Sequence, residues 1–204
     1  MITIIDYGVG NIKSIQNMLK RIGVPSLLTK RSEDISNATK LILPGVGNFD
    51  YGMEQLNSSG LIEGLNFKVF QEKTPILGIC LGAQMLGNKS EEGSNKGLGW
   101  IDMDIVKFNS KKLSKDLKIP QMNWSEINIK KSSPILNKLD NNSRFYFVHS
   151  FHMQANSPDD ILCTSNYGYE FVSGVNKENI YGVQFHPEKS HKFGMQLLEN
   201  FSIL

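Results

Sequence analysis

The chain has 204 residues, of which 40% are hydrophobic and 21% charged, a balance typical of a folded protein and not of a disordered or low-complexity chain. Lysine and arginine (22) nearly balance aspartate and glutamate (20), so the net charge of +2 predicts neither nucleic acid nor a membrane surface as a partner. Two cysteines are too few for a disulfide framework, and neither a signal-peptide pattern nor a long apolar run is present. We expect one cytoplasmic domain spanning residues 1–204.

The first half of the chain alternates short apolar runs with amphipathic stretches. Strands are expected over residues 2–5, 27–29, 41–43 and 75–79. Helices are expected over residues 11–22, around 61–70 and from Gly82 onward. Alternating strands and helices of this kind predict a parallel sheet with right-handed crossovers.

The second half is richer in strands. These are expected over residues 100–108, 145–148, 161–164, 170–175 and 180–185. A short helix is expected over 133–139 and an amphipathic terminal helix over 192–201. The predicted fold class is therefore α/β, with an open mixed, mainly parallel central sheet flanked by helices and additional strands in the C-terminal half.

Cys80 lies in the sequence Gly78-Ile79-Cys80-Leu81-Gly82, between an apolar strand and a helix. This is the G-x-nucleophile-x-G pattern of a sharp strand-to-helix turn, with sulfur in place of a serine oxygen. The glycines relieve the crowding of such a turn, and the helix N-terminus favours the thiolate. The pattern predicts a nucleophile at Cys80, whereas Cys163 has no such context and is expected in the core.

A nucleophilic thiolate usually needs a base, and His186 is the best placed of the four histidines. It follows the strand 180–185 and precedes a proline, which favours extended backbone at His186. Extended side chains at i and i+2 lie on one face roughly 6.6 Å apart, so Glu188 is expected to hydrogen-bond and orient the imidazole. Cys80, His186 and Glu188 are thus a candidate nucleophile, base and orienting carboxylate.

Zinc coordination is a rival interpretation of the same three residues. Cys80, His186 and Glu188 would suit zinc, but no closely spaced ligand pair such as C-x-x-C or H-E-x-x-H accompanies them, and no metal site is expected. His149 and His152 lack a comparable context, so we expect them to be mainly structural.

A glycine-rich loop, Pro44-Gly45-Val46-Gly47, follows the third predicted strand. Glycines allow backbone N–H groups to approach a reacting carbon closely. Together with the N–H of Leu81, the loop at Val46 and Gly47 is expected to form an oxyanion hole.

Two motifs, Gly-Ile-Cys-Leu-Gly at 78–82 and Gln-Phe-His-Pro-Glu at 184–188, together resemble the class I glutamine amidotransferase family. Further segments make nearly the whole chain similar to the glutaminase subunits of imidazole glycerol phosphate synthases; they are DYGVGN at 6–11, PGVGNF at 44–49, GLGW at 97–100, FYFVHS at 145–150 and HPEKS at 186–190. The resemblance implies that Cys80 attacks the side-chain amide of L-glutamine and that His186 protonates the leaving ammonia. A γ-glutamyl thioester would then be hydrolysed to glutamate without a cofactor.

The resemblance also implies which residues hold the substrate glutamine. They are Gly47, Gln84, Glu92, Ser150 and Phe151. In the family the oxyanion loop is thought to need a peptide rearrangement before it becomes competent, so glutamine hydrolysis would wait for the acceptor substrate in a partner.

The partner implied by the resemblance is a cyclase subunit with a (β/α)8-barrel fold, paired with this chain as a heterodimer. It would receive ammonia through a channel and form imidazole glycerol phosphate and AICAR in histidine biosynthesis. Enclosure has a physical reason, because ammonia in neutral water is mostly protonated and loses its nucleophilic lone pair.

Departures from the family pattern concern the acceptor pathway. The segment at 120–125 reads Pro-Gln-Met-Asn-Trp-Ser, where the family usually has Pro-His-Met-Gly-Trp-Asn. Phe151 stands where many members have tyrosine. His152 and the tail at 190–194 resemble those of relatives that supply ammonia for surface-polysaccharide sugars. The pathway therefore stays open between histidine synthesis and sugar amidination. The rivals from other functional classes are a stand-alone cysteine hydrolase and a non-catalytic binding subunit.

Overall fold

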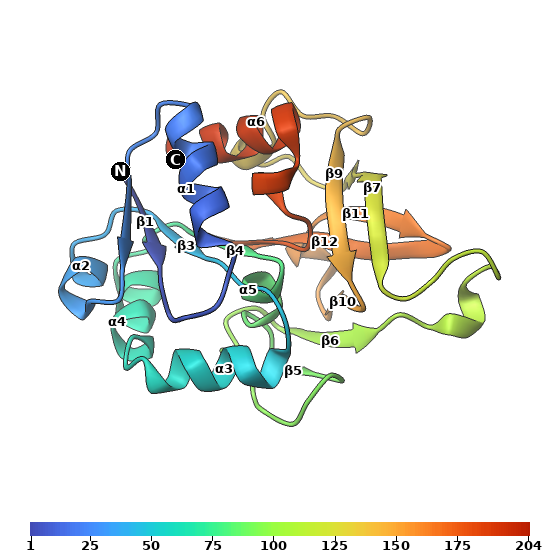
Figure 1. Ribbon diagram of the computed structural model, residues 1–204, viewed down its shortest axis with the longest axis horizontal. Coiled ribbons are helices and arrows are strands. Elements are labelled where there is room, and N and C mark those ends of the chain that lie inside the picture. Colours follow the sequence, from blue (N-terminus) through green and yellow to red (C-terminus); the bar gives the residue numbers. More distant parts are fainter.

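The computed structural model describes all residues from 1 to 204 and contains two β-sheets (Figure 1). The strands of the larger sheet are β1 (Ile2–Ile5), β2 (Ser26–Thr29), β3 (Leu41–Leu43), β4 (Ile76–Ile79), β5 (Lys89–Ser90), β6 (Met103–Lys107), β8 (Asn128–Ile129), β10 (Phe151–Ala155), β11 (Ile161–Tyr167), β12 (Tyr169–Lys177) and β13 (Ile180–Val183). The smaller sheet pairs β7 (Gln121–Glu126) with β9 (Arg144–His149). The α-helices are α1 (Ile12–Arg21), α2 (Ser32–Ser36), α3 (Phe49–Ser58), α4 (Ile62–Asn66), α5 (Leu81–Gln84) and α6 (His191–Ser202).

The large sheet begins as a parallel sheet and is extended by antiparallel strands. Strands β2, β1, β3, β4 and β13 lie side by side in that order, and every neighbouring pair among them is parallel. The order continues through β12, β10, β6 and β5, in which antiparallel pairs predominate. The arrangement confirms the predicted α/β fold with an open mixed sheet, flanking helices and additional C-terminal strands.

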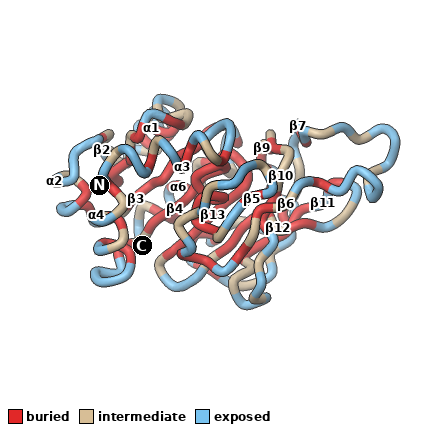
Figure 2. The backbone as a smooth tube through the Cα atoms, turned by 90° about the horizontal axis from the view of Figure 1, so that it is seen from below, coloured by how far each residue is buried: buried red, intermediate tan, exposed pale blue.

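Helices cover both faces of this sheet, with a hydrophobic core on each side. The core beneath α1 and α6 contains Ile4 of β1 and Leu197 of α6, whereas the core beneath α3 and α4 contains Ile5 of β1 and Leu65 of α4. Ile4 and Ile5 point to opposite faces because successive strand residues alternate. Figure 1 shows α1 and α6 on one side and α3 and α4 on the other, and Figure 2 shows buried backbone concentrated along the central strands.

The sequence does not predict α3, although its buried positions follow helical spacing. The helix begins after Asn48, whose side chain accepts a hydrogen bond from the Tyr51 N–H and caps it. Its buried residues are Phe49, Gly52, Met53 and Leu56. Gly52 and the preceding glycine-rich loop weaken the helical pattern in the sequence. The helix is stabilised by packing of its buried residues, because its intrinsic helix propensity is low.

Several predicted boundaries differ from the structure. The helix expected over 133–139 is reduced to a 3-10 turn at Pro134–Leu136, and the helix expected from Gly82 onward spans only Leu81–Gln84. Strand β7 is not predicted because its sequence is polar, and it is held by pairing with β9. No helix combines the length and the hydropathy that a membrane span requires.

The turn between β4 and α5 depends on close packing against β3. A Cβ added at Gly82 would lie 1.9 Å from the Leu43 carbonyl oxygen, and one added at Gly78 would lie 2.7 Å from the Cα of Ala83. Both distances are shorter than a van der Waals contact and involve backbone atoms. A larger side chain at either position therefore requires the backbone of β3 or α5 to move.

We predict that Gly82→Ala lowers the free energy of unfolding by about 3 kcal/mol, near the upper end of the usual cost of overpacking, since the added methyl group meets a backbone carbonyl. Gly64→Ala in α4 is the matched control, because its added Cβ meets only a methyl group of Ile35 at 3.8 Å. The control should change stability by no more than about 1 kcal/mol. Urea unfolding followed by circular dichroism measures both, and equal stability of the two variants would contradict the packing argument.

Candidate active site

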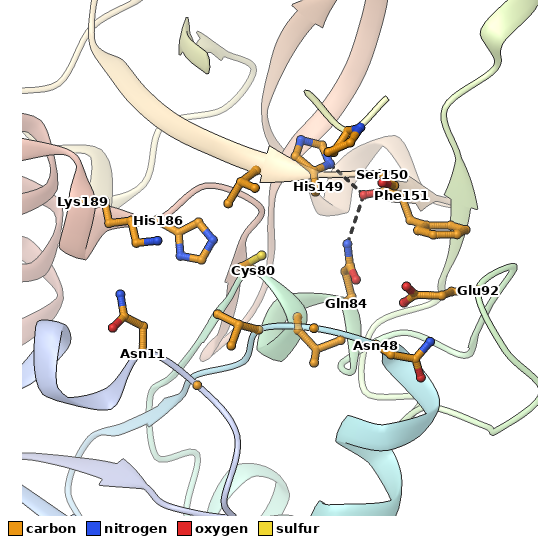
Figure 3. A pocket seen from close by; sticks show the side chains of 16 residues that line it. Asn11, Asn48, Cys80, Gln84, Glu92, His149, Ser150, Phe151, His186 and Lys189 are labelled. Atoms are coloured by element: carbon orange, nitrogen blue, oxygen red, sulfur yellow. Dashed lines mark hydrogen bonds between the residues drawn. The ribbon is translucent and has the colours of Figure 1, made fainter. Parts of the chain in front are cut away.

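A cavity of about 700 Å³ opens where the carboxyl ends of the parallel strands meet the strand pair β9 and β10. Its walls are the loop after β3, the turn after β4, the segment 148–151 and the segment after β13 (Figure 3). The cavity brings together side chains from widely separated stretches of the chain. In open α/β sheets this edge is where ligands bind.

Cys80 occupies the turn between β4 and α5 with a strained backbone conformation. Its φ of 53° and ψ of −110° lie in a region that non-glycine residues rarely adopt. The Cys80 N–H is bonded to the Val183 carbonyl at 2.8 Å, which ties the turn to β13. The sharp strand-to-helix turn predicted from the glycine pair is therefore present, and the side chain of Cys80 faces the cavity.

His186 and Glu188 form a buried pair beside the sulfur. The His186 Nδ1 lies 2.8 Å from the Glu188 Oε1, and each side chain is 1% exposed. The two residues were expected to share the face of an extended segment, but Glu188 lies in a 3-10 turn that begins at Pro187. The 3-10 turn brings the two side chains together, so the expected hydrogen bond forms although the backbone is not extended at Glu188. The Asn11 amide also donates to Glu188, at 3.4 Å.

The environment of His186 favours its protonated form. Burial alone would lower the pKa of this histidine, but the Cys80 side chain and the Glu188 carboxylate raise it to about 10. The raised pKa means that the ring carries a proton on each nitrogen at neutral pH. His186 Nε2 then has a proton available on the side of the ring that faces the cavity (Figure 3).

The groups expected to form the oxyanion hole lie around the same cavity. Val46 and Gly47 line it from the loop after β3, and Leu81 lines it from the first turn of α5. The N–H groups of these three residues are not donors in any of the backbone hydrogen bonds of loops and turns. Gly47 has a φ of 97°, a conformation that glycine adopts without strain.

The residues expected to hold glutamine also line the cavity. They are Gly47, Gln84, Glu92, Ser150 and Phe151. Both hydrogens of the Gln84 amide are used by buried acceptors, the Phe151 carbonyl at 3.1 Å and the Gln184 Oε1 at 3.0 Å. The Glu92 carboxylate accepts the Phe49 N–H at 2.8 Å, at the start of α3. One wall of the cavity therefore presents acceptor oxygens.

Two cavity residues and a buried neighbour are not predicted from the sequence. Lys189 and Asn11 line the cavity near His186, and Gln184 lies beneath its floor with its Nε2 at 3.7 Å from the Cys80 sulfur. Gln184 belongs to the Gln-Phe-His-Pro-Glu motif, but the motif alone does not indicate a contact with Cys80. His149, expected to be mainly structural, also lines the cavity and donates through Nδ1 to the Phe151 carbonyl at 2.7 Å.

Comparison with known proteins identifies the family. Residues 3–204 match the family model described as glutamine amidotransferase class-I. The chain belongs to the class-I glutamine amidotransferase family. This amidotransferase is 57% identical to imidazole glycerol phosphate synthase subunit HisH 2 of Methanococcus maripaludis and 53% identical to the HisH 2 subunit of Pseudomonas aeruginosa, in each case over 98% of both chains. The resemblance carried by the motifs is confirmed.

Solved structures with lower sequence identity show the same fold. A putative GMP synthase subunit from Thermoplasma acidophilum superimposes with a TM-score of 0.70 at 23% identity, covering 98% of this amidotransferase and 91% of that chain. PurLQS from Thermotoga maritima gives a TM-score of 0.72 at 17% identity over 98% and 96% of the two chains. At these identities the comparison shows a shared fold.

We predict that His186 stays protonated above neutral pH and that Cys80→Ala lowers its pKa, because the substitution removes one of the two partners that oppose burial. Side-chain NMR spectra of the histidines, recorded between about pH 5 and 11, report the His186 pKa in both proteins. His149 provides an internal reference, since burial lowers its pKa to about 3 and keeps it neutral over that range. Titration of His186 near its ordinary pKa in the unaltered protein would contradict the ion-pair geometry.

Proposed function

We propose that the chain is the glutaminase subunit of an imidazole glycerol phosphate synthase and that it hydrolyses L-glutamine to glutamate and ammonia. The observation that carries the proposal is the buried arrangement of Cys80, His186 and Glu188 at one cavity. It occurs in a chain whose full-length relatives are named as subunits of that synthase.

In the first half of the proposed reaction, the Cys80 thiolate attacks the side-chain amide carbon of glutamine. The C–S bond forms while the C–N bond breaks, and the His186 Nε2 gives its proton to the leaving nitrogen, so that ammonia departs. Glu188 holds the ring through Nδ1, which keeps Nε2 aimed at the substrate. The products of this half are ammonia and a γ-glutamyl thioester on Cys80.

In the second half, water hydrolyses the thioester. The now neutral His186 accepts a proton from the attacking water, the C–S bond breaks, and glutamate leaves while the thiolate re-forms. Both halves place negative charge on the former amide oxygen. The N–H of Leu81, with N–H groups from the loop at Val46 and Gly47, is positioned around the cavity to stabilise that charge.

The proposed binding mode follows from the acceptor-rich wall of the cavity. Because both hydrogens of the Gln84 amide are already bonded, its Oε1 is the atom left for the substrate. An oxygen there and the Glu92 carboxylate suit the N–H donors of the α-ammonium group of glutamine. Ser150 and Phe151 bound the same side of the cavity.

The proposed partner is a (β/α)8-barrel cyclase subunit that receives the ammonia. Relatives named as synthase subunits support a second polypeptide. Pro120 lines the cavity, and β7 begins at the next residue with Met122 and Trp124 61% and 41% exposed. Exposed apolar side chains beside a cavity mouth suit a protein interface.

The proposal treats residues 1–204 as one glutaminase domain in the cytoplasm. A single large sheet joins strands from both halves of the chain, which supports one domain. Both cysteines are free and buried, Cys80 at the site and Cys163 in the core, as a reducing compartment permits.

We predict that Cys80→Ala abolishes glutamine hydrolysis, with a loss of at least about 100-fold, since no other thiol faces the cavity. Cys163→Ala is the matched control, because burial raises the pKa of that thiol to about 12 and leaves it unreactive. Glutamate release by the protein with its co-purified partner measures both variants. Equal loss in both, or substantial turnover by Cys80→Ala, would remove Cys80 from the proposed mechanism.

The acceptor pathway is tested by comparing two activators of the same complex. If the chain serves histidine synthesis, the ribulosyl nucleotide intermediate of that pathway should raise glutamate release several-fold or more, because acceptor binding would make the oxyanion loop competent. The alternative is a glutaminase for surface-polysaccharide sugars, and the side chains at Gln121, Asn123 and Ser125 motivate it. Response to a nucleotide-activated sugar and not to the ribulosyl nucleotide would establish that alternative. Full activity without any partner would instead favour a stand-alone hydrolase.

A further inference from the structure

Gln184 is the buried amide closest to the nucleophile. It follows β13, has no exposed surface, and its backbone N–H is bonded to the Ser173 carbonyl at 2.9 Å. Its Nε2 lies 3.7 Å from the Cys80 sulfur, and its Oε1 accepts from the Gln84 Nε2 at 3.0 Å. The side chain therefore connects the sulfur with the glutamine-binding wall of the cavity.

The orientation of this amide is fixed by a chain of hydrogen bonds that ends at a backbone carbonyl. The Phe151 carbonyl can only accept, so the group of Gln84 that faces it at 3.1 Å must be the NH2 (Figure 3). The same NH2 lies against Gln184, so the group of Gln184 that faces it must be the oxygen. The remaining group of Gln184, its NH2, is then the one directed at Cys80.

A second residue anchors the same carbonyl. His149 donates through Nδ1 to the Phe151 oxygen at 2.7 Å, and burial lowers the pKa of His149 to about 3, so its ring is neutral. The groups that fix the direction of the two amides therefore add no formal charge. The group that this hydrogen-bond chain directs at the sulfur is one N–H dipole, that of the Gln184 amide.

We infer that Gln184 is a positioning residue that donates a hydrogen bond to the Cys80 sulfur and stabilises its negative charge. The inference rests on the proposed function, in which Cys80 is the nucleophile. His186 gives up its proton when ammonia leaves, whereas an amide keeps its hydrogen throughout. Gln184 thus stabilises the sulfur both before attack and when the C–S bond of the thioester breaks. Hydrogen bonds to charged acceptors are the stronger kind, and burial strengthens this one further.

A purely structural role makes a different prediction. If Gln184 only filled space, a methionine of similar length would occupy the site without changing the reactivity of Cys80. If it donates to the sulfur, methionine removes the donor while the shape is kept. Gln184→Glu goes further, because it keeps an acceptor for the Gln84 amide and places a second oxygen beside the sulfur.

The test is the rate at which iodoacetamide alkylates Cys80 in the full chain without its partner, followed from about pH 5 to 9. We expect Gln184→Met to react about tenfold more slowly near neutral pH, with its profile moved about one pH unit upward. Gln184→Glu should be slower still. The ionisable groups next to Cys80 are Tyr7 and His186, and His186 is backed by Glu188; Glu92, His149 and Lys189 line the same cavity. The pKa values of Tyr7 and His186 are raised above this range, so neither group changes its charge during the measurement.

Asn200→Leu is the matched control for loss of a buried amide. Asn200 is 3% exposed and donates to the carbonyls of Ile135 and Asn137, away from the cavity. Thermal unfolding checks that all variants fold. If Gln184→Met does not fold, the alkylation rate of Cys80 in Gln184→Glu tests the inference. A folded Gln184 variant with alkylation within about twofold of the unaltered protein, or an equal slowing in Asn200→Leu, overturns the inference. If the Gln184 variants slow the alkylation of Cys80 as expected but the protein with its partner does not hydrolyse glutamine, the proposed function alone is overturned.

Discussion

The strained backbone at Cys80 is the constraint on which the rest of the site depends. A positive φ at a non-glycine residue costs of order 1–3 kcal/mol and persists only where its surroundings over-determine it. Here the surroundings are the backbone of β3, which approaches Gly82 too closely for any side chain, and β13, whose Val183 carbonyl binds the Cys80 N–H. The parallel core of the sheet thus holds the nucleophile at its edge. The same turn places Leu81 in the cavity wall.

Two kinds of group surround the sulfur, and they have different tasks. The raised pKa of His186 favours a charged ring, which Glu188 supports from the far side, and in the proposed reaction this ring exchanges protons. Gln184 and Gln84 are neutral amides whose direction is set by the Phe151 carbonyl. A second charged donor near the sulfur would raise the cost of protonating His186, since like charges oppose each other. Neutral, fixed dipoles supply stabilisation without that cost, and burial keeps His149, which anchors them, uncharged as well.

Local sequence patterns predict the turns, strands and helices whose conformation depends on residues close by in the chain. The strand-glycine-cysteine-glycine pattern predicts the turn at Cys80, and β1, β3 and α1 appear within a residue or two of their expected bounds. The polar strand β7 is not predicted, because its stability comes from pairing with β9 some twenty residues later in the chain. Gln184 is not predicted for a similar reason, since its partners Cys80 and Gln84 are about a hundred residues distant. Periodicity carries no information on such contacts.

The three departures from the family segment at 120–125 form one hydrogen-bonded set. Gln121, Asn123 and Ser125 alternate along β7 and are hydrogen-bonded to one another, with the Gln121 Nε2 at 2.9 Å from Asn123 and 3.0 Å from Ser125, and the Ser125 hydroxyl at 3.0 Å from Asn123. Three hydrogen bonds thus join the three side chains into one set within the strand. Met122 and Trp124 stand at the intervening positions and are the exposed apolar members of β7. The three departures therefore lie on one face of β7, whereas Met122 and Trp124, which the family segment also has, lie on the face that the proposal assigns to the partner.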